Sequence, residues 1–179
     1  MNRKNNKHYQ KTHEDLQKTL VELAEKHDYV TVKMLCDSVG INRSTFYLHY
    51  LSFADLLNET YRNSFNSLDG IYKSFDHPVE PLSYESFLII CRHAQQNKGF
   101  YRLFLRAQDT FPISEGFEYL WDTTFVPIYQ RMHVPYEQMH FRFVCVQAGF
   151  SHTLRSWLEK DCPVPAEDIA RIMHECLHL

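Results

Sequence analysis

The sequence predicts an all-α protein made of a small three-helix unit followed by a larger helical domain. Apolar residues recur at helical spacing along most of the chain, and glycines or pairs of prolines separate the periodic segments. No segment alternates apolar and polar residues in the way that indicates a half-buried strand. A length of 179 residues suits one small head and one mid-sized domain, and we place the boundary between 1–51 and 52–179.

The first three expected helices contain a helix-turn-helix pattern. A first helix is expected over 13–26, and residues 31–50 then read as a helix, a tight turn and a second short helix. Thr31 stands at an N-cap position, Gly40 can end the helix with a positive φ, and Asn42 is a strong N-cap for the second helix. The apolar face of the helix before the turn consists of Val32, Leu35, Cys36 and Val39.

A helix-turn-helix of this kind binds DNA, and the N-terminal residues of its second helix contact base edges. Arg43, Ser44 and Thr45 occupy those positions and are expected to read the base sequence. The full set predicted to contact DNA within the motif is Thr31, Lys33, Asn42, Arg43, Ser44, Thr45, Tyr47 and His49.

The net charge of −3 is unevenly distributed along the chain. Residues 1–50 hold eight Lys or Arg and six Asp or Glu, so this part is positive by 2 and the remainder is negative by 5. The first ten residues contain no acid, and Arg3 and Lys4 are predicted to lie along phosphates or to enter a minor groove. The same segment also fits a soluble tail, and the sequence favours neither interpretation.

The next helix is expected from Ser52 to about residue 74. The Ser-x-x-acid spacing of Ser52 and Asp55 is that of a capping box, and the positive end of this helix would face a phosphate. Two prolines in 76–82 then separate the helix from the body. The helices expected in the body are 84–96, 99–106, 113–132 with a bend at Pro127, 136–159 and 166–179.

The run from Val30 to Leu57 resembles the TetR family of bacterial transcriptional regulators. The glycine turn, the Thr-Phe-Tyr-x-His-Tyr sequence of 45–50 and the Ser-x-x-Asp-Leu-Leu sequence of 52–57 all match that family. The resemblance implies phosphate contacts from Tyr47 and His49, a palindromic double-stranded DNA site, a homodimer and a small-molecule effector.

Two positions depart from the family pattern. Phe53 stands where the family usually has a lysine that helps to hold a phosphate, so one expected DNA contact is missing. Cys36 stands where a small residue, commonly alanine, is usual, and we expect it to pack as a small apolar side chain. A redox-sensing role would instead need an exposed Cys36 with a lowered pKa.

Homodimerisation is also expected from the mechanism, because one short helix reads too few base pairs and such proteins bind paired half-sites. The last two helices form the interface in proteins of this family. The interface residues expected here are those of the final helix together with Phe141, Val144, Cys145, Ala148 and His152. The alternative is that the same stripe packs inside its own subunit.

The resemblance also implies an effector cavity among the middle helices of the body. An apolar, aromatic lining with a few polar anchors suits a flat hydrophobic effector. The residues predicted to line it are Phe87, Tyr101, Phe104, Phe117, Trp121, Phe125, Tyr129, Phe143, Gln147 and His152. For any single one of them, the plain apolar core is the favoured interpretation, because aromatic side chains at helical spacing more often belong to a core than to a pocket.

Other classes of function have little support in the sequence. We identify no phosphate loop, nucleophile elbow or coherent catalytic set, and expect neither an enzyme nor a cofactor. His174 and His178 have the spacing of two helix-borne zinc ligands, but no third ligand has a clear spacing, so a surface pair is expected. Five scattered cysteines, with no membrane span and no signal region, suit the reducing cytoplasm of a bacterium.

The sequence therefore predicts a sequence-specific transcriptional regulator, a repressor that a small-molecule effector releases from DNA. The alternative is a TetR-like coactivator or regulator that acts through a protein partner, with weak or ligand-dependent DNA binding. Phe53 is the residue that keeps this alternative open.

Overall fold

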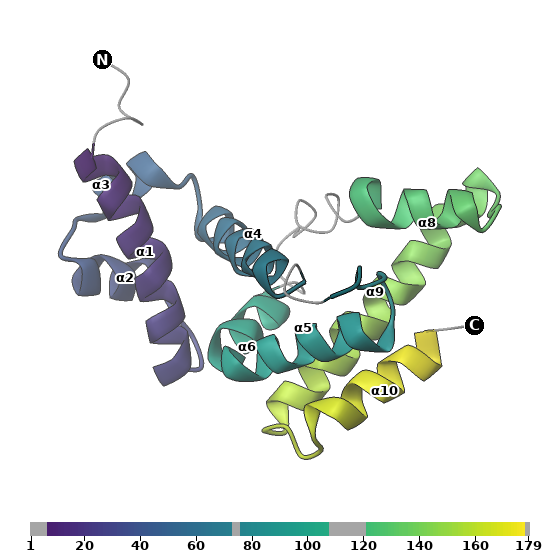
Figure 1. Ribbon diagram of the computed structural model, residues 1–179. Helices are drawn as coiled ribbons and strands as arrows, with labels where there is room; N and C mark the ends of the chain where they lie inside the picture. The colour runs from purple at the N-terminus through teal and green to yellow at the C-terminus, as the bar shows by residue number, and fades with distance from the viewer. Residues whose placement is uncertain (1–6, 73–75, 108–120, 178–179) are drawn as a thin grey trace.

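The chain has the predicted all-α fold (Figure 1). The computed structural model describes residues 7–72, 76–107 and 121–177, and across these ranges the regular elements are helices, without a strand. The elements of the head are α1 (Lys7–Lys26), α2 (Val32–Val39) and α3 (Arg43–His49). A longer helix, α4 (Phe53–Tyr72), leads from the head to the body.

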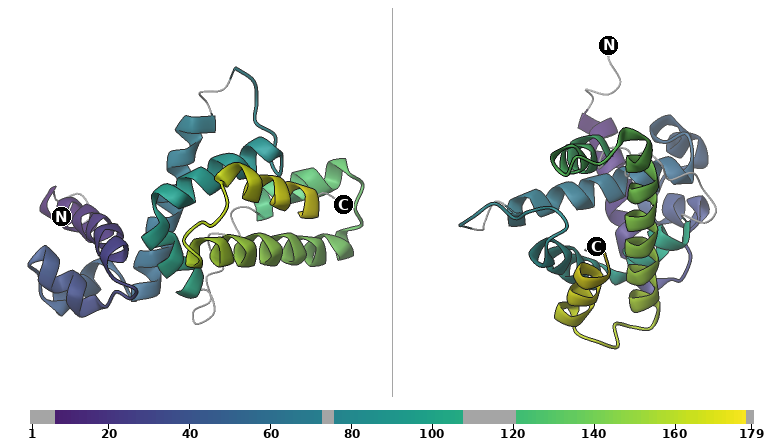
Figure 2. Two further views of the ribbon diagram at one scale, coloured as in Figure 1. Left: turned by 90° about the horizontal axis from the view of Figure 1, so that it is seen from below. Right: turned by 90° about the vertical axis from the view of Figure 1, so that its right-hand side faces the viewer.

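The body is a bundle of helices that begins at residue 84. Its elements are α5 (Tyr84–Gln96), α6 (Lys98–Ala107), the π-helical segment η2 (Trp121–Phe125), α8 (Val126–Arg131), α9 (Tyr136–Glu159) and α10 (Ala166–Leu177). α10 packs mainly on α5, and α6 packs on α9. Figure 2 shows α9 extended along the body with α10 beside it. The head meets the body where α1 packs on α6.

One apolar core runs from the head into the body. Leu16 and Phe46 in the head and Phe104 and Leu158 in the body are fully buried members of the same cluster. A large apolar side chain stabilises a fold by about 1.5–3 kcal/mol when it is fully buried. The shared core therefore fixes the head against the body. A second, smaller cluster lies beside the N-terminal half of α9 and consists of Phe125, Tyr129, Val134 and Met139.

Most of the helix bounds expected from the sequence agree with the structure, and the first helix is an exception. α5 and α9 begin and end at the expected residues. α1 begins at Lys7, six residues before the expected start. The additional turns bring Tyr9 onto the end of α3, where its ring stacks on His49 with the ring centroids 4.0 Å apart. The additional turns of α1 thus make a contact with a residue that is distant in the sequence. Apolar periodicity carries no information about such contacts.

The helix expected over 113–132 also differs. Residues 113–120 lie outside the described residues, and the remainder is not one continuous α-helix. A π-helical segment, η2, ends at Phe125, and α8 follows it directly. Pro127 lies in the first turn of α8 and not at a bend inside a longer helix. A proline is well tolerated there because the N–H groups of a first helical turn have no partner within the helix.

Candidate nucleic-acid interface

The turn between α2 and α3 is held by the caps that the sequence predicts. Oγ1 of Thr31 accepts a hydrogen bond of 3.2 Å from the backbone N–H three residues further on. Gly40 has a φ of 76°, and its N–H donates to the carbonyl of Cys36 at 2.9 Å. Oδ1 of Asn42 accepts from the N–H of Thr45 at 2.8 Å. These bonds satisfy helix-end groups that otherwise lack partners, so the start of α3 is fixed relative to α2.

The start of α3, where the sequence predicts base contacts, is exposed to solvent. Six of the predicted DNA-contact residues are exposed, namely Thr31, Lys33, Asn42, Arg43, Ser44 and Tyr47. Phe46 is fully buried and anchors the helix, and the ring of Tyr47 meets it edge-on at 5.3 Å. Thr45 is half-buried and its hydroxyl donates to Oδ1 of Asn42 at 3.0 Å, so this proton is already engaged. Arg43 and Ser44 are therefore the polar side chains best placed to reach base edges.

His49 lies at the C-terminal end of α3 and is half-buried against α1. Its ring stacks on Tyr9, and the ring centroid of His13 lies 5.8 Å away. Burial lowers the pKa of His49, and the nearby His13 and His8 lower it further. His49 is thus neutral at pH 7, and a phosphate contact from it would use a neutral N–H.

A polar network joins α1 to the end of α3 and to α4. Nε2 of His13 lies 2.9 Å from Oε1 of Glu59 and 3.1 Å from the hydroxyl oxygen of Tyr50. Gln17 donates to the same hydroxyl at 3.0 Å, and its Oε1 accepts from Asn63 at 2.9 Å. Burial raises the pKa of Tyr50, so its hydroxyl stays protonated. The C-terminal end of α3 is therefore held by polar contacts with α1, which α1 shares with α4.

Sequence reasoning did not identify this network. The available signal is the spacing of Tyr9, His13 and Gln17, which follow one another at four-residue intervals on one face of α1. With the first helix expected to begin at residue 13, Tyr9 fell outside it. Polar residues on one face of a helix usually indicate that the face is exposed to solvent. Here their hydrogen-bond partners belong to other helices that are distant in the sequence.

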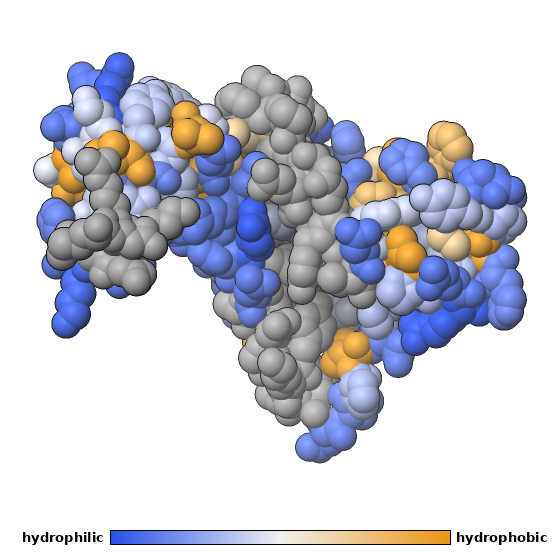
Figure 3. All heavy atoms as spheres, turned by 90° about the horizontal axis from the view of Figure 1, so that it is seen from above, coloured by the Kyte–Doolittle hydropathy of each residue, from blue (hydrophilic) through white to orange (hydrophobic). Residues whose placement is uncertain are grey.

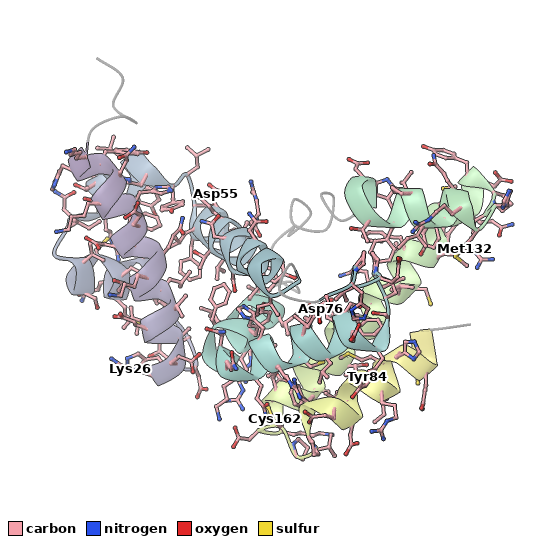
Figure 4. All side chains as sticks on the ribbon, in the orientation of Figure 1. Lys26, Asp55, Asp76, Tyr84, Met132 and Cys162 are labelled. Carbon is pink, nitrogen blue, oxygen red and sulfur yellow. The ribbon has the colours of Figure 1, made fainter. Side chains whose placement is uncertain are left out.

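The start of α4 has the predicted cap and lacks a cation. Oγ of Ser52 accepts from the N–H of Asp55 at 3.1 Å, which confirms the cap at this helix start. Phe53 is half-buried and packs against the main core. Figure 4 labels Asp55 at the end of α4 that lies against the head. Position 53 thus contributes apolar contact and no charged donor to a phosphate.

The described surface of the head carries little net charge. Residues 7–50 hold six Lys or Arg and six Asp or Glu, so the excess over 1–50 comes from Arg3 and Lys4, which lie outside the described residues. Beside the predicted DNA contacts, Leu48 and Leu51 are 60% and 89% exposed. In the view from above, hydrophobic residues are visible on the head as well as on the body (Figure 3). Electrostatic attraction to phosphates by residues 7–50 alone is therefore weak.

The residues predicted for an effector pocket fall into separate groups. Phe87, Tyr101 and Phe104 are buried in the main core, where Phe104 stacks on Tyr61 with centroids 3.9 Å apart. Gln147 is half-buried, and His152 is exposed. Phe117 lies outside the described residues. The structure does not gather these residues around one space.

The remaining predicted residues belong to the smaller cluster or pack against it. They are Trp121, Phe125, Tyr129 and Phe143. The rings of Phe125 and Phe143 meet at a centroid distance of 4.8 Å. The hydroxyl of Tyr129 is buried here without a hydrogen-bond partner in the part of the chain that the structure describes, and burial raises its pKa. Leaving a buried hydroxyl without a hydrogen bond costs free energy, and a ligand that bonds to the hydroxyl would remove this cost.

A small pocket lies between the end of α1 and α6. Its volume is about 150 Å³, and its lining includes Lys26, Asp28, Lys98, Arg102 and Arg106. Pockets for drug-sized ligands measure about 300–1,000 Å³ and have mostly apolar walls. The pocket contains none of the predicted effector residues and does not suit a flat hydrophobic ligand.

An apolar stripe is exposed along α9. Phe141 is 74% exposed and Val144 is 45% exposed, and Cys145 and His152 are exposed as well. Ala148, in the same stripe, is half-buried. On the neighbouring α10, Ile172 is 46% exposed. The stripe that the sequence predicts for dimerisation is thus largely on the surface of the single subunit.

The last candidates from the sequence are the redox role of Cys36, the histidine pair and a membrane span. Cys36 is buried, and burial raises its pKa, so it packs as a small apolar side chain as predicted. Within the described ranges, no three His, Cys, Asp or Glu residues lie together in a way that could hold a metal ion. His178, one of the two histidines considered as zinc ligands, lies outside those ranges. Among the described helices, none is long and apolar enough to cross a bilayer.

Comparison with known proteins identifies the family of this chain and a solved structure with a similar fold. Residues 83–179 match the model of a TetR-type family described as "Transcriptional regulator C-terminal region". No curated protein matches the chain. Among solved structures, the fatty acid degradation regulator FadR from Bacillus halodurans is similar, with a TM-score of 0.58 and 13% identity over 92% of this chain and 93% of that one. At this identity the similarity establishes the fold alone.

Proposed function

We propose that this chain, which belongs to the TetR family of transcriptional regulators, binds a palindromic double-stranded DNA site as a homodimer and is a repressor released by a small-molecule effector. The observation that carries the proposal is the start of α3, which is capped by Asn42, anchored by the buried Phe46 and open to solvent at Arg43 and Ser44. Such a helix start is what a helix-turn-helix presents to the major groove.

The exposed residues around α3 divide by the part of DNA that they would contact. We assign base reading to Arg43 and Ser44, because side chains at the start of a recognition helix reach base edges. Tyr47 projects from the same helix and would donate to a phosphate, which positions the helix without selecting a sequence. The other predicted contacts keep their roles as predictions, namely Thr31, Lys33, Asn42, Thr45, His49, Arg3 and Lys4.

The stripe on α9 supports a homodimer through α9 and α10. A side chain as large as Phe141 is seldom left 74% exposed along a stripe that also contains Val144. A two-fold pairing of this stripe with its copy would cover both. It would place two recognition helices about 34–36 Å apart, which is one turn of DNA, or at a multiple of that spacing.

The smaller cluster is the place where an effector would act. Tyr129 offers a buried hydroxyl without a partner, and Trp121, Phe125 and Phe143 offer aromatic walls. An effector that binds a different arrangement of the body more tightly would shift the population away from the DNA-competent form. The similar protein from Bacillus halodurans regulates fatty acid degradation, so fatty acids are the first class of compound to test.

A second candidate is a TetR-like regulator that acts through a protein partner in the cytoplasm and binds DNA weakly or only with a ligand. Phe53 provides no cation at the start of α4, which would face a phosphate, and residues 7–50 carry no net charge. Leu48 and Leu51 add exposed apolar surface next to α3. These features favour contact with a protein more than contact with a polyanion.

The deciding experiment is capture of fragmented genomic DNA from the source organism by the purified chain, followed by sequencing of the retained fragments at moderate salt. Enrichment of one palindrome, reduced in Arg43→Ala, is the expected result. A folded dimer that enriches no motif, with or without added fatty acids, would contradict sequence-specific binding. Replacement of Phe53 by Lys would then test whether the missing cation is the cause.

A further inference from the structure

The first turn of α6 lacks a cap from its own sequence. Asn97 precedes the helix and occupies the position of a local cap. Its Nδ2 instead donates to the carbonyl of His93 at 2.9 Å, so the side chain completes the end of α5. The backbone N–H groups in the first turn of α6 therefore need another acceptor, because they have no partner within the helix.

Glu25 of α1 provides that acceptor. Its Oε1 accepts from the N–H of Gly99 at 2.9 Å and from the N–H of Phe100 at 3.4 Å. A carboxylate at this point also meets the positive end of the α6 dipole. In its own helix, Glu25 occupies the last turn, where a negative charge is unfavourable. The position of this acid is thus explained by α6 and not by α1.

Gly99 makes this approach possible. A Cβ at residue 99 would lie 2.3 Å from the carbonyl oxygen of Ala24 and 2.6 Å from Cα of Glu25. Both of these atoms belong to the backbone of α1, so no side-chain rotation could relieve the overlap. The two helices therefore touch backbone to backbone at the point where Glu25 caps α6.

α6 extends this contact to the end of α9. Nε of Arg102 donates to the carbonyl of Leu158 at 2.8 Å, and Lys98 pairs with Asp161 at 2.7 Å. These two cations lower the pKa of the Asp161 carboxyl, Lys98 having the larger effect. Figure 4 labels Lys26 at the end of α1 and Cys162 in the turn that follows α9. α6 is thus bonded on one side to the head and on the other to the helix that we assign to the dimer interface.

We propose that Glu25 is a positioning residue: by capping α6 across the contact between head and body, its carboxylate sets the orientation of the head and hence the spacing of the two recognition helices in the dimer. The inference rests on the proposed DNA-binding function. It predicts a role in choosing the distance between half-sites and none in choosing the bases within a half-site.

The test compares Glu25→Ala and Glu25→Gln with Glu22→Ala. Glu22 lies on the same helix and pairs with Lys18 of that helix at 3.8 Å, so its replacement removes one negative charge and does not remove the cap of α6. Glu25→Gln retains an oxygen acceptor and keeps the protein testable if Glu25→Ala folds poorly. The probes are the palindrome captured by the wild-type chain and versions whose half-sites are moved by one or two base pairs.

The wild-type chain and Glu22→Ala are expected to prefer the native spacing. In Glu25→Ala that preference should fall about tenfold, a normal size for coupling between parts of a protein, with base preference unchanged. Glu25→Gln should retain part of the preference. Equal loss of affinity at every spacing, or an unchanged preference, would overturn the proposal.

A second measurement does not depend on DNA. Hydrogen–deuterium exchange at the amides of Gly99 and Phe100 should become faster in Glu25→Ala and stay unchanged in Glu22→Ala. Unchanged exchange in Glu25→Ala would refute the cap even if DNA binding were altered. If the wild-type chain captured no palindrome while exchange changed as expected, the DNA-binding function and the spacing role would be wrong, and the cap itself would be correct.

Discussion

Two helix starts in the head are completed by neighbours in the sequence, whereas one helix start in the body is completed by a residue of the head. In the head, α2 and α3 are capped by Thr31 and Asn42, and Ser52 caps the start of α4, each three residues before the N–H that it binds. In the body, α5 has such a local cap, whereas α6 is capped by Glu25 of α1. The caps within the helix-turn-helix are therefore supplied by neighbours in the sequence, and a cap at the contact between head and body is supplied by a residue 74 positions away.

This difference separates two properties of a DNA-binding dimer. Base recognition depends on which side chains stand at the start of α3 and on the local caps that hold them. Half-site spacing depends on how the head is placed relative to the helices proposed for dimerisation. Mutations at the two kinds of contact should therefore have different consequences, and the following predictions test that division.

The largest effect is expected from crowding the contact between head and body. Gly99→Ala should lower the free energy of unfolding by about 3 kcal/mol, the upper part of the usual range for overpacking, because its Cβ would meet the backbone of α1. Gly40→Ala is the matched change inside the head. It has open space around it and a φ of 76°, so it should cost about 1 kcal/mol from backbone conformation alone.

Urea unfolding of both variants gives the comparison. Gly99→Ala should also couple to Glu25→Ala in a double-mutant cycle, because a displaced α6 no longer presents its N–H groups to the carboxylate. A Gly99→Ala variant as stable as Gly40→Ala, with additive effects, would show that the close approach of α1 and α6 carries little free energy.

Removing a base contact should have the next largest effect, on binding. Arg43→Ala is expected to cost about 1–3 kcal/mol of affinity for the captured palindrome and to relax preference at particular base positions. Tyr47→Phe removes one hydroxyl and should weaken all sequences similarly. Binding to a panel of single-base variants of the palindrome separates the two. A change of base preference in Tyr47→Phe with overall affinity intact would reverse our assignment of the two residues.

Loss of a local cap should have a smaller effect that stays within the head. Asn42→Ala removes the acceptor for the N–H of Thr45 and should lower the free energy of unfolding by about 1 kcal/mol. Asn42→Asp keeps an acceptor and serves as the control for stability. DNA affinity should fall in Asn42→Ala while the preferred half-site spacing stays the same. A shift in spacing preference would mean that local caps and head placement are not separable.

The parts of the fold that were predictable from sequence are those set by local chemistry. Gly40 and the caps at Thr31, Asn42 and Ser52 were identified because each depends on residues a few positions away. The bounds of α5 and α9 agree with expectation for a similar reason, since prolines or cap residues flank periodic apolar segments. Phe53 was also recognisable from the sequence, because the TetR pattern that the chain resembles has a lysine at this position.

The remaining features depend on distant partners. The early start of α1 goes with the stacking of Tyr9 on His49, and the cap by Glu25 spans 74 residues. The predicted effector residues share one chemical character, yet Phe104 lies in the main core and Phe125 in the smaller cluster. Helical spacing shows that such a side chain faces inward. It does not show which cluster the side chain joins.

The smallest expected effect is on pH dependence, and it should arise in both regions. Burial lowers the pKa of His49 in the head and of His93 in the body below the value of 6.5 that describes the unfolded chain. As the pH falls below about 6.5, the unfolded state binds these protons more readily than the folded state, so the free energy of unfolding decreases. The contribution is complete above that pH and is lost progressively under acid conditions.

His49→Gln and His93→Gln should each flatten the decline in the free energy of unfolding measured by urea titration between pH 7 and about pH 5, where the unfolded imidazoles become charged. The wild-type chain, titrated in parallel, is the reference. The two effects should add, because one histidine lies in the head and the other in the body. The pKa of His49 is lowered by burial and also by the charges of His13 and His8, whereas burial is the cause at His93. Salt screens interactions between charges, so the effect of His49→Gln on the slope should depend on salt concentration and that of His93→Gln should not. A decline that is equally steep in both variants and in the wild-type chain would assign the acid sensitivity to other groups.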